Sequence, residues 1–367
     1  MIDQAGMTIG RRRKPRERTL RGRSRTPVAF VAWGAVAGRS MEIAELLGGR
    51  AYVLFPPDEG RRPPAAVRYA VSSLLTLFYL AREDPGAVVT TIPPVPLGLI
   101  ALAWARLRGV PCALDSHPGA FGKQGDRVSA RLLPVPRYLV RHADVTHVTA
   151  EPWVETVREW GGRGLVVHEA PGSWESLERV PREAGGRPRV LLVSRFAGDE
   201  PVEEAVKAAA LVPEIDLLVT GRTEDLPSEL AGSAPSNVSF VGFLPAARYR
   251  RLVAEADVVV ALTTEPTSVM RCAYEAVYAR KPLLISDWPL CRELFPFALT
   301  VFNDSASIAE GLRRAVSSLP ELENHVDEAL ALQVGRWRSQ FATLVSVLGQ
   351  SRPARHTGLT LPCSPGR

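Results

Sequence analysis

Short apolar segments alternate with helix-length segments along most of the chain, and this pattern constrains the fold more than any other feature. It predicts an α/β protein, with parallel strands joined by right-handed crossovers and helices covering both faces of each sheet. The predicted strands are 28–33, 51–55, 87–91, 111–115, 144–149, 164–169, 189–194, 215–220, 237–242, 257–263, 282–287 and 299–302. The predicted helices are 41–48, 66–82, 96–107, 127–141, 151–160, 201–211, 245–255, 268–279, 289–294 and 305–318.

Residues 171–188 interrupt the alternation with three Pro and three Gly, a composition typical of a linker. A chain of 367 residues is long enough for two domains that each bury a core. We therefore predict two Rossmann-like domains, 27–170 and 189–322, whose parallel sheets face each other across a cleft. A last amphipathic helix, within 323–350, has no strand after it, and we expect it to pack back across the linker.

Basic residues are concentrated at the two ends of the chain. Of the net charge of +6, residues 1–26 carry +7 and residues 351–367 carry +3, which leaves −4 for 27–350. We expect a disordered basic arm at 1–26 and a disordered tail at 351–367, because neither offers an apolar face to bury. The body is mildly acidic, so the overall charge does not indicate specific nucleic-acid binding.

The cysteines indicate a reducing compartment. Four cysteines lie far apart, with no CxxC pair and no His at metal-ligand spacing, which argues against a disulfide framework and a structural zinc site. The N-terminus lacks the apolar region of a signal peptide, and the longest apolar stretches are about half of a bilayer span. We predict a cytoplasmic protein with no metal and no bound cofactor.

Two predicted helices, 66–82 and 96–107, are apolar nearly all round. One interpretation is that both are covered core, as such helices usually are. The other is peripheral contact with an anionic membrane, at the inner face of the plasma membrane, because arginines stand at their edges. These arginines are Arg61, Arg62, Arg68, Arg106 and Arg108.

The segment 263–282, TTEPTSVMRCAYEAVYARKP, follows a predicted strand of the second half. We expect Thr267 or Ser268 to cap the helix after it, whose free N–H groups would point at an anion. Arg271 and Glu275 are four residues apart and share one face of that helix. The cation of Arg271 would bind the diphosphate of a nucleotide-sugar, and the carboxylate of Glu275 would accept hydrogen bonds from its ribose hydroxyls.

The loops contain neither a GxGxxG motif nor a P-loop, which disfavours dinucleotide oxidoreductases and NTPases. The strand–loop–helix with Glu275, followed by KPL (281–283) and SD (286–287), resembles the donor-site signature of GT-B glycosyltransferases of the group 1, family 4-like type. The resemblance covers nearly all of 27–348 and is strongest over 189–318. It implies the GT-B fold and a nucleotide-sugar co-substrate.

The same resemblance assigns roles to two residues and shows two departures. Glu275 matches the glutamate that binds the donor ribose in the family, and Arg195 in VSRF (193–196) matches an arginine near the diphosphate. The family's first glutamate would fall on Thr267, two residues from Glu265. Its lysine, five residues after the arginine, is replaced by Glu200.

Three further segments are similar to the chitobiosyldiphosphodolichol mannosyltransferase group. They are IPPVPLGLIA (92–101), ALDSHPGAF (113–121) and DEPVEEAV (199–206). This likeness implies metal-independent transfer to a lipid-linked acceptor.

Asp115 is the last residue of a predicted apolar strand and His117 follows it closely, where sites lie in this fold class. Either would serve as a general base or would orient the acceptor. The alternative is structural, with Asp115 accepting backbone N–H bonds in the loop. An inverting reaction would need a base and a retaining reaction would not, and the sequence leaves both open.

The remaining candidates also follow strands. Phe243 and Leu244 are expected either to stack on the base or to pack in the core, and Gly34 either permits close approach of a substrate or simply makes a turn. The other predicted substrate-binding residues are Gly221, Thr264, Glu265, Thr267 and Ser268.

These observations favour a hexosyltransferase that moves a sugar from a UDP- or GDP-sugar to a glycan or lipid-linked acceptor, in cell-surface polysaccharide or glycoconjugate biosynthesis. Stabilisation of the departing nucleoside diphosphate would supply most of the catalysis. Two alternatives stay open: a nucleotide-sugar epimerase on the same fold, and a non-catalytic nucleotide-sugar-binding protein.

Overall fold

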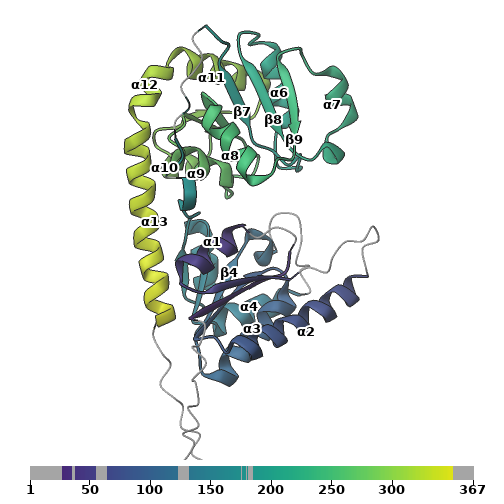
Figure 1. The fold of residues 1–367 in the computed structure, drawn as a ribbon, viewed down its shortest axis with the longest axis vertical. Helices are drawn as coiled ribbons and strands as arrows, with labels where there is room; N and C mark the ends of the chain where they lie inside the picture. The colour runs from purple at the N-terminus through teal and green to yellow at the C-terminus, as the bar shows by residue number, and fades with distance from the viewer. Residues whose placement is uncertain are drawn as a thin grey trace, which may run out of the picture.

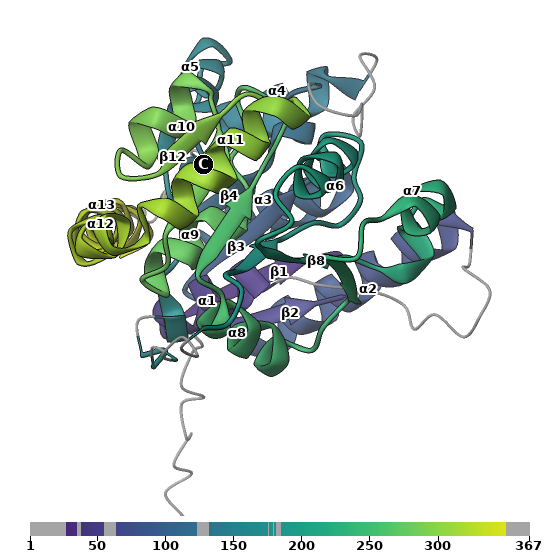
Figure 2. The ribbon, with the colours of Figure 1, turned by 90° about the horizontal axis from the view of Figure 1, so that it is seen from above.

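The computed structural model describes residues 27–34, 38–54, 64–122, 132–174, 176–178, 180 and 185–349. These residues form two parallel six-stranded sheets with packed helices, seen in Figure 1 and Figure 2. The predicted α/β class with two Rossmann-like sheets is confirmed. The expected arm at 1–26, the tail at 351–367 and the beginning of the helix predicted at 127–141 lie outside the described residues.

The first sheet has the spatial order β2-β1-β3-β4-β5-β6. Every residue of β1, β3 and β4 is buried, as expected for central strands of a parallel sheet. Its strands are β1 (Val28–Ala32), β2 (Arg50–Val53), β3 (Ala87–Ile92), β4 (Cys112–Ser116), β5 (Val145–Val148) and β6 (Gly164–Val166). The accompanying helices are α1 (Gly38–Leu46), α2 (Ala65–Glu83), α3 (Val95–Arg108), the short η1 (Pro118–Phe121), α4 (Pro134–His142) and α5 (Glu151–Glu159).

The second sheet has the order β12-β11-β10-β7-β8-β9. Its strands are β7 (Arg189–Leu192), β8 (Asp216–Thr220), β9 (Val238–Gly242), β10 (Val258–Ala261), β11 (Leu283–Ser286) and β12 (Leu299–Val301). Its helices are α6 (Val202–Ala210), η4 (Thr223–Asp225), α7 (Ser228–Ser233), α8 (Ala246–Glu255), α9 (Arg271–Tyr278), α10 (Pro289–Leu294) and α11 (Ser305–Ser317). Helix α7 was not predicted, because it is short and buries only Leu230.

The last two helices connect the domains. After α12 (Leu319–Asn324), the long α13 (Val326–Gly349) runs along both domains in Figure 1. Near its start the buried Gln333 donates to the backbone oxygen of Leu294 in the second domain. Near its end Leu344 belongs to the apolar cluster that contains Phe30 of β1. The predicted return of the C-terminal helix is therefore confirmed.

Candidate functional site at the domain junction

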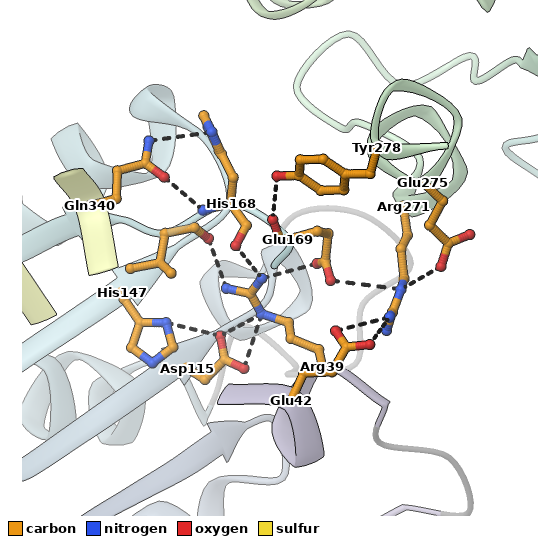
Figure 3. Close-up of polar contacts among 11 residues, drawn as sticks. Arg39, Glu42, Asp115, His147, His168, Glu169, Arg271, Glu275, Tyr278 and Gln340 are labelled. Atoms are coloured by element: carbon orange, nitrogen blue, oxygen red, sulfur yellow. Dashed lines mark hydrogen bonds and ion pairs between the residues drawn. The ribbon is translucent and has the colours of Figure 1, made fainter. Parts of the chain in front are cut away.

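The candidate site lies where the segments after the first-domain strands meet those after β10 in the second domain (Figure 3). Tyr278 Oη in α9 donates to the backbone oxygen of Glu169, three residues beyond β6, at 2.8 Å. Trp153 Nε1 in α5 donates to the backbone oxygen of Thr267 at 3.2 Å. Ligands of open parallel sheets bind beyond the carboxyl ends of the strands, which is where these segments lie.

Arg39, the second residue of α1, is the buried centre of the first-domain part of this site. Its side chain reaches Asp115, with Nε 3.3 Å from each carboxylate oxygen, and Glu169, with Nη1 3.0 Å from Oε1. It also donates to the backbone oxygens of Val167 at 2.8 Å and His168 at 3.1 Å. A buried guanidinium is tolerated only when it is paired and hydrogen-bonded. Arg39 therefore holds α1, β4 and the segment after β6 in one arrangement.

Asp115 lies inside the first domain and is only 1 % exposed. Burial by itself raises the pKa of Asp115, but the charge of Arg39 and the contact with His147 outweigh it and hold this pKa well below its usual range. His147 Nδ1 lies 3.2 Å from Oδ1 of Asp115 and is also buried. A carboxylate with so low a pKa is a poor proton acceptor, so the geometry favours a positioning role for Asp115 over the predicted role as a base.

His117 is the exposed member of the predicted Asp115–His117 pair. It is the first residue after β4, and its backbone N–H donates to Ile92 at 2.9 Å. Its exposed side chain keeps it a candidate for contact with an acceptor.

His168 connects the site to α13. Its backbone N–H donates to Oε1 of Gln340 at 3.0 Å, and its Nδ1 lies 3.3 Å from Nε2 of the same side chain. Burial and the positive charges of Arg39 and Arg336 lower the pKa of His168 from 6.5 to about 4. The imidazole is therefore neutral at pH 7.

Arg271 is the second-domain cation of the site, and three carboxylates surround it. Its Nη2 donates to both carboxylate oxygens of Glu42 in α1, at 3.0 and 3.2 Å. Its Nε donates to Oε1 of Glu275 at 2.8 Å and lies 3.8 Å from Oε2 of Glu169. A Cβ atom on Gly38 would lie 3.0 Å from Nη1 of Arg271, so this glycine allows the close approach of α1. The predicted Arg271–Glu275 pair is present, and two first-domain carboxylates join it.

Glu275 is held from two sides. Its Oε1 accepts from Arg271, and its Oε2 accepts from Oη of Tyr249 in α8 at 2.7 Å. Burial raises the pKa of Glu275 and of Glu42, and Arg271 opposes this in both cases. Each oxygen of Glu275 keeps a second lone pair, so the carboxylate can still accept a hydrogen bond from a hydroxyl group.

The charges of this cluster do not balance. Arg39 and Arg271 are two cations, and four carboxylates contact them: Glu42, Asp115, Glu169 and Glu275. An anionic ligand near Arg271 would therefore compete with these carboxylates, because the surrounding charge is already negative.

The start of α9 differs from the prediction. The helix begins at Arg271 with Met270 at the N-cap position, and no side chain caps it, so Thr267 and Ser268 are not caps. Residues before it form a turn in which Ser268 N donates to the backbone oxygen of Glu265 at 3.2 Å. Thr264 N donates to the backbone oxygen of Asp199 at 2.8 Å, which connects this loop to the one after β7. Loop contacts thus replace the expected first turn of the helix.

Glu200 organises the loop after β7. Its Oε2 accepts hydrogen bonds from Ser194 Oγ at 2.7 Å, Arg195 N at 2.7 Å and Ala197 N at 3.2 Å. The Arg195 side chain is 76 % exposed, with Nε 3.8 Å from Oε1 of Glu200. A carboxylate of the chain itself therefore occupies the amides of this loop, beside Arg195, the residue that the family resemblance assigns to the diphosphate.

The other predicted residues have distinct surroundings. Gly221 has φ of +144°, and a Cβ there would lie 2.3 Å from the ring of Phe196, so close packing as well as backbone conformation requires glycine. Phe243 follows β9 and is 68 % exposed, which rules out core packing for it, whereas Leu244 is half-buried. Gly34 lies two residues beyond β1.

Several residues of the site were not predicted, namely Arg39, Glu42, Glu169, Tyr249 and Tyr278. A signal was present for Arg39, because it is four residues before Ile43 and so lies on the buried face of α1. Glu169 ends a predicted strand, where polar residues of sites are expected. For Tyr249 and Tyr278 no local pattern distinguishes them from core aromatics.

Within the described ranges, no group of three or more His, Cys, Asp or Glu side chains is arranged to hold a metal ion.

Residues 18–172 match a family model described as the glycosyl transferase 4-like domain. A comparison with curated protein sequences gives no match.

Many solved structures resemble most of the chain, and three represent them. HepE of Anabaena, solved in complex with UDP-glucose, has 15 % identity and a TM-score of 0.67, covering 88 % of this chain and 99 % of that one. Sucrose-phosphate synthase of Thermosynechococcus elongatus has 17 % identity and a TM-score of 0.60, covering 87 % and 100 %. Trehalose 6-phosphate synthase of Burkholderia multivorans has 14 % identity and a TM-score of 0.61, covering 88 % and 96 %. The chain therefore has the fold of GT-B glycosyltransferases, and its N-terminal half matches the glycosyl transferase 4-like domain.

Proposed function

We propose that the protein is a metal-independent glycosyltransferase that moves a hexose from a UDP- or GDP-sugar to a lipid-linked carbohydrate acceptor, in the assembly of a cell-surface glycan. The match over residues 18–172 and the UDP and UDP-glucose complexes of HepE support a nucleotide-sugar donor. The observation that carries the proposal is Arg271, a cation at the domain junction and at the start of a helix that follows a central strand.

The donor would bind by an exchange of ion-pair partners. Its diphosphate would take the place of the Glu42 carboxylate on Nη2 of Arg271, and the first amides of α9 would face the same anion. Glu275, held by Tyr249, would accept from a ribose hydroxyl. The exposed ring of Phe243 would stack on the base.

In the transfer step, Arg271 and the start of α9 would stabilise the charge that develops on the departing nucleoside diphosphate. His117 would contact the acceptor at the end of β4. In an inverting reaction it would also take the proton of the attacking hydroxyl, whereas a retaining reaction needs no such base.

A thermal-shift panel with UDP, GDP and dTDP tests the proposal and selects the nucleotide. A ligand at about 100 times its Kd stabilises a protein by about 2.7 kcal/mol, so we expect a rise in Tm of several degrees with one of them. Arg271→Ala should abolish the shift and the transfer while the protein stays folded. Arg292→Ala, which removes a half-exposed arginine of α10, is the matched control and should keep both. No shift of the wild-type Tm with any of the three nucleotides would contradict a nucleotide-sugar donor.

One observation favours a second candidate, a non-catalytic nucleotide-sugar-binding protein. The Glu200 carboxylate occupies the amides of the loop after β7, so the donor has fewer groups available for its phosphates. This candidate predicts nucleotide binding by calorimetry with neither hydrolysis nor transfer across a panel of acceptors. Release of the nucleoside diphosphate together with a glycoside product would exclude it.

A further inference from the structure

Helix α2 turns an apolar side outward, although two of its three buried residues are polar. Its buried residues are Ser72, Thr76 and Leu80. The residues on the opposite side, spaced four, three and four apart, are Val67, Val71, Leu74 and Phe78, with exposed fractions of 49, 38, 68 and 54 %. We call these four residues the apolar stripe of α2. Leu75 and Leu77 flank it and are also exposed.

A hydrogen bond on the inner side of α2 joins the helix to the segment after β1. Trp33 Nε1, just after β1, donates to Oγ1 of Thr76 at 2.9 Å. The same Oγ1 donates to the backbone oxygen of Ser72 at 2.7 Å. Rotating the helix to bury the apolar stripe would break the Trp33 contact. The interpretation of α2 as covered core is therefore wrong, whereas α3 does bury one side through residues such as Leu97 and Leu102.

Helices α2 and α3 together carry a net positive charge, even when Asp84 at the end of α2, which pairs with Arg108, is included. Helices α2 and α3, which contact each other, contain four arginines and a single glutamate. Residues 27–350 as a whole carry a net charge of −4, so the net charge of these two helices is opposite in sign to that of the rest of the folded chain. Arg82 lies on the same face of α2 as the stripe, four residues beyond Phe78. An exposed apolar stripe with an exposed arginine on the same face, on a pair of helices of net positive charge, is complementary to an anionic lipid surface.

We propose that the apolar stripe of α2 lies in the surface of an anionic membrane, with the helix parallel to the membrane plane. Within the described parts of the chain, no helix has the length and apolarity to cross a bilayer. The 19 residues of α2 would therefore lie at the interface, with Arg82 near the lipid headgroups. The inference rests on the proposed function only in that a lipid-linked acceptor would explain why the protein binds a membrane. Membrane binding itself can be measured without any transfer reaction.

Co-sedimentation of the full chain with vesicles tests this inference. One set of vesicles is phosphatidylcholine, and the other contains about a third phosphatidylglycerol. The wild type should bind the anionic vesicles about tenfold more tightly, and the double variant L74S/F78S should lose about tenfold or more of this affinity. Arg82→Gln should weaken binding to anionic vesicles by about fivefold and leave binding to neutral vesicles unchanged.

Leu211→Ser is the matched control, because Leu211 is 52 % exposed but lies after α6 in the second domain. It should bind vesicles as the wild type does. Vesicle binding that L74S/F78S leaves unchanged would overturn the proposal and point to the basic residues 1–26. The proposal would also be overturned if the wild type did not bind vesicles but formed dimers in sedimentation velocity, and L74S/F78S abolished these dimers. The apolar stripe would then bind a second copy of the chain. The rise in Tm with nucleotide is measured for the same proteins. Because it does not depend on vesicles, it distinguishes a failure of membrane binding from a failure of the proposed function.

Discussion

Arg271 at the start of α9 donates to both carboxylate oxygens of Glu42 in α1, at 3.0 and 3.2 Å, across 229 positions of the sequence. This ion pair joins α1, the helix that follows β1 in the first domain, to α9, the helix that follows the central strand β10 of the second. The cation best placed for a diphosphate therefore already has an anionic partner, and that partner belongs to the opposite domain. If the donor binds Arg271 as proposed, its binding would be coupled through this one guanidinium to the relative position of the domains.

Glu42→Gln should strengthen the binding of the preferred nucleoside diphosphate. The variant removes the charge that competes for Arg271, and a partly exposed pair of this kind contributes about 1 kcal/mol, or about fivefold in Kd. Isothermal calorimetry measures the effect. Glu45→Gln, on the exposed side of the same helix, is the control and should bind as the wild type does. Weaker binding by Glu42→Gln would mean that Glu42 holds Arg271 in place for the donor.

Arg39→Met should destabilise the first domain severely. The substitution leaves the Asp115 carboxylate buried without its main cation, and breaking a buried pair costs about 3–5 kcal/mol. Denaturant unfolding measures the loss. Arg50→Met removes an exposed arginine that pairs with Glu83 and should cost about 0.5 kcal/mol or less. A similar small loss for Arg39→Met would show that the buried network does not hold the domain together.

His168 should make the protein less stable in mild acid. Its pKa is about 4 when folded and 6.5 when unfolded, so between these values the unfolded chain binds more protons. The free energy of unfolding should therefore fall as the pH drops from about 6.5 to about 4, by about 3 kcal/mol from this residue.

The variant His168→Phe isolates this contribution, because it keeps a ring against Tyr274, whose centroid lies 5.3 Å from that of the imidazole. Unfolding free energies are compared at pH 7.5 and pH 4.5 for both proteins. Other groups titrate alike in the two, so the wild type should lose more stability than the variant. Equal losses would show that His168 is not a buried neutral base.

Phe243→Ala should weaken nucleotide binding and leave stability unchanged. The ring is 68 % exposed, so its loss leaves no cavity, whereas stacking of a base on an aromatic ring contributes about 1–3 kcal/mol. We expect a Kd for the preferred nucleotide about tenfold higher. Phe302→Ala is the control, since Phe302 is 66 % exposed and also follows a strand. Equal affinities of the two variants would remove Phe243 from the donor site.

Features that depend on neighbours within a few residues could be predicted. Each apolar segment of four to seven residues became a strand, because burial on both faces of a parallel sheet requires such a run. The pair of Arg271 and Glu275 followed from their spacing of four on a helix, and the structure brings them to 2.8 Å. The exact start of α9 was wrong, because loop contacts of Thr264 and Glu265 compete with the helix there.

Contacts between distant segments could not be predicted. Nothing near Arg39 indicates Asp115, 76 positions away, and nothing near Arg271 indicates Glu42. The outward face of α2 is a similar case, because its composition allowed both covered core and an exposed surface, and the exposure of Leu74 and Phe78 decides between them.

The sequence by itself thus determined the two sheets, the succession of their strands along the chain and the strand ends where a site would form, since these follow from local periodicity. Only the tertiary structure decided which charges share the junction and which face of α2 meets solvent. The physical reason is that burial makes each charge depend on its partners, and those partners come from segments that only the packed chain brings within 4 Å.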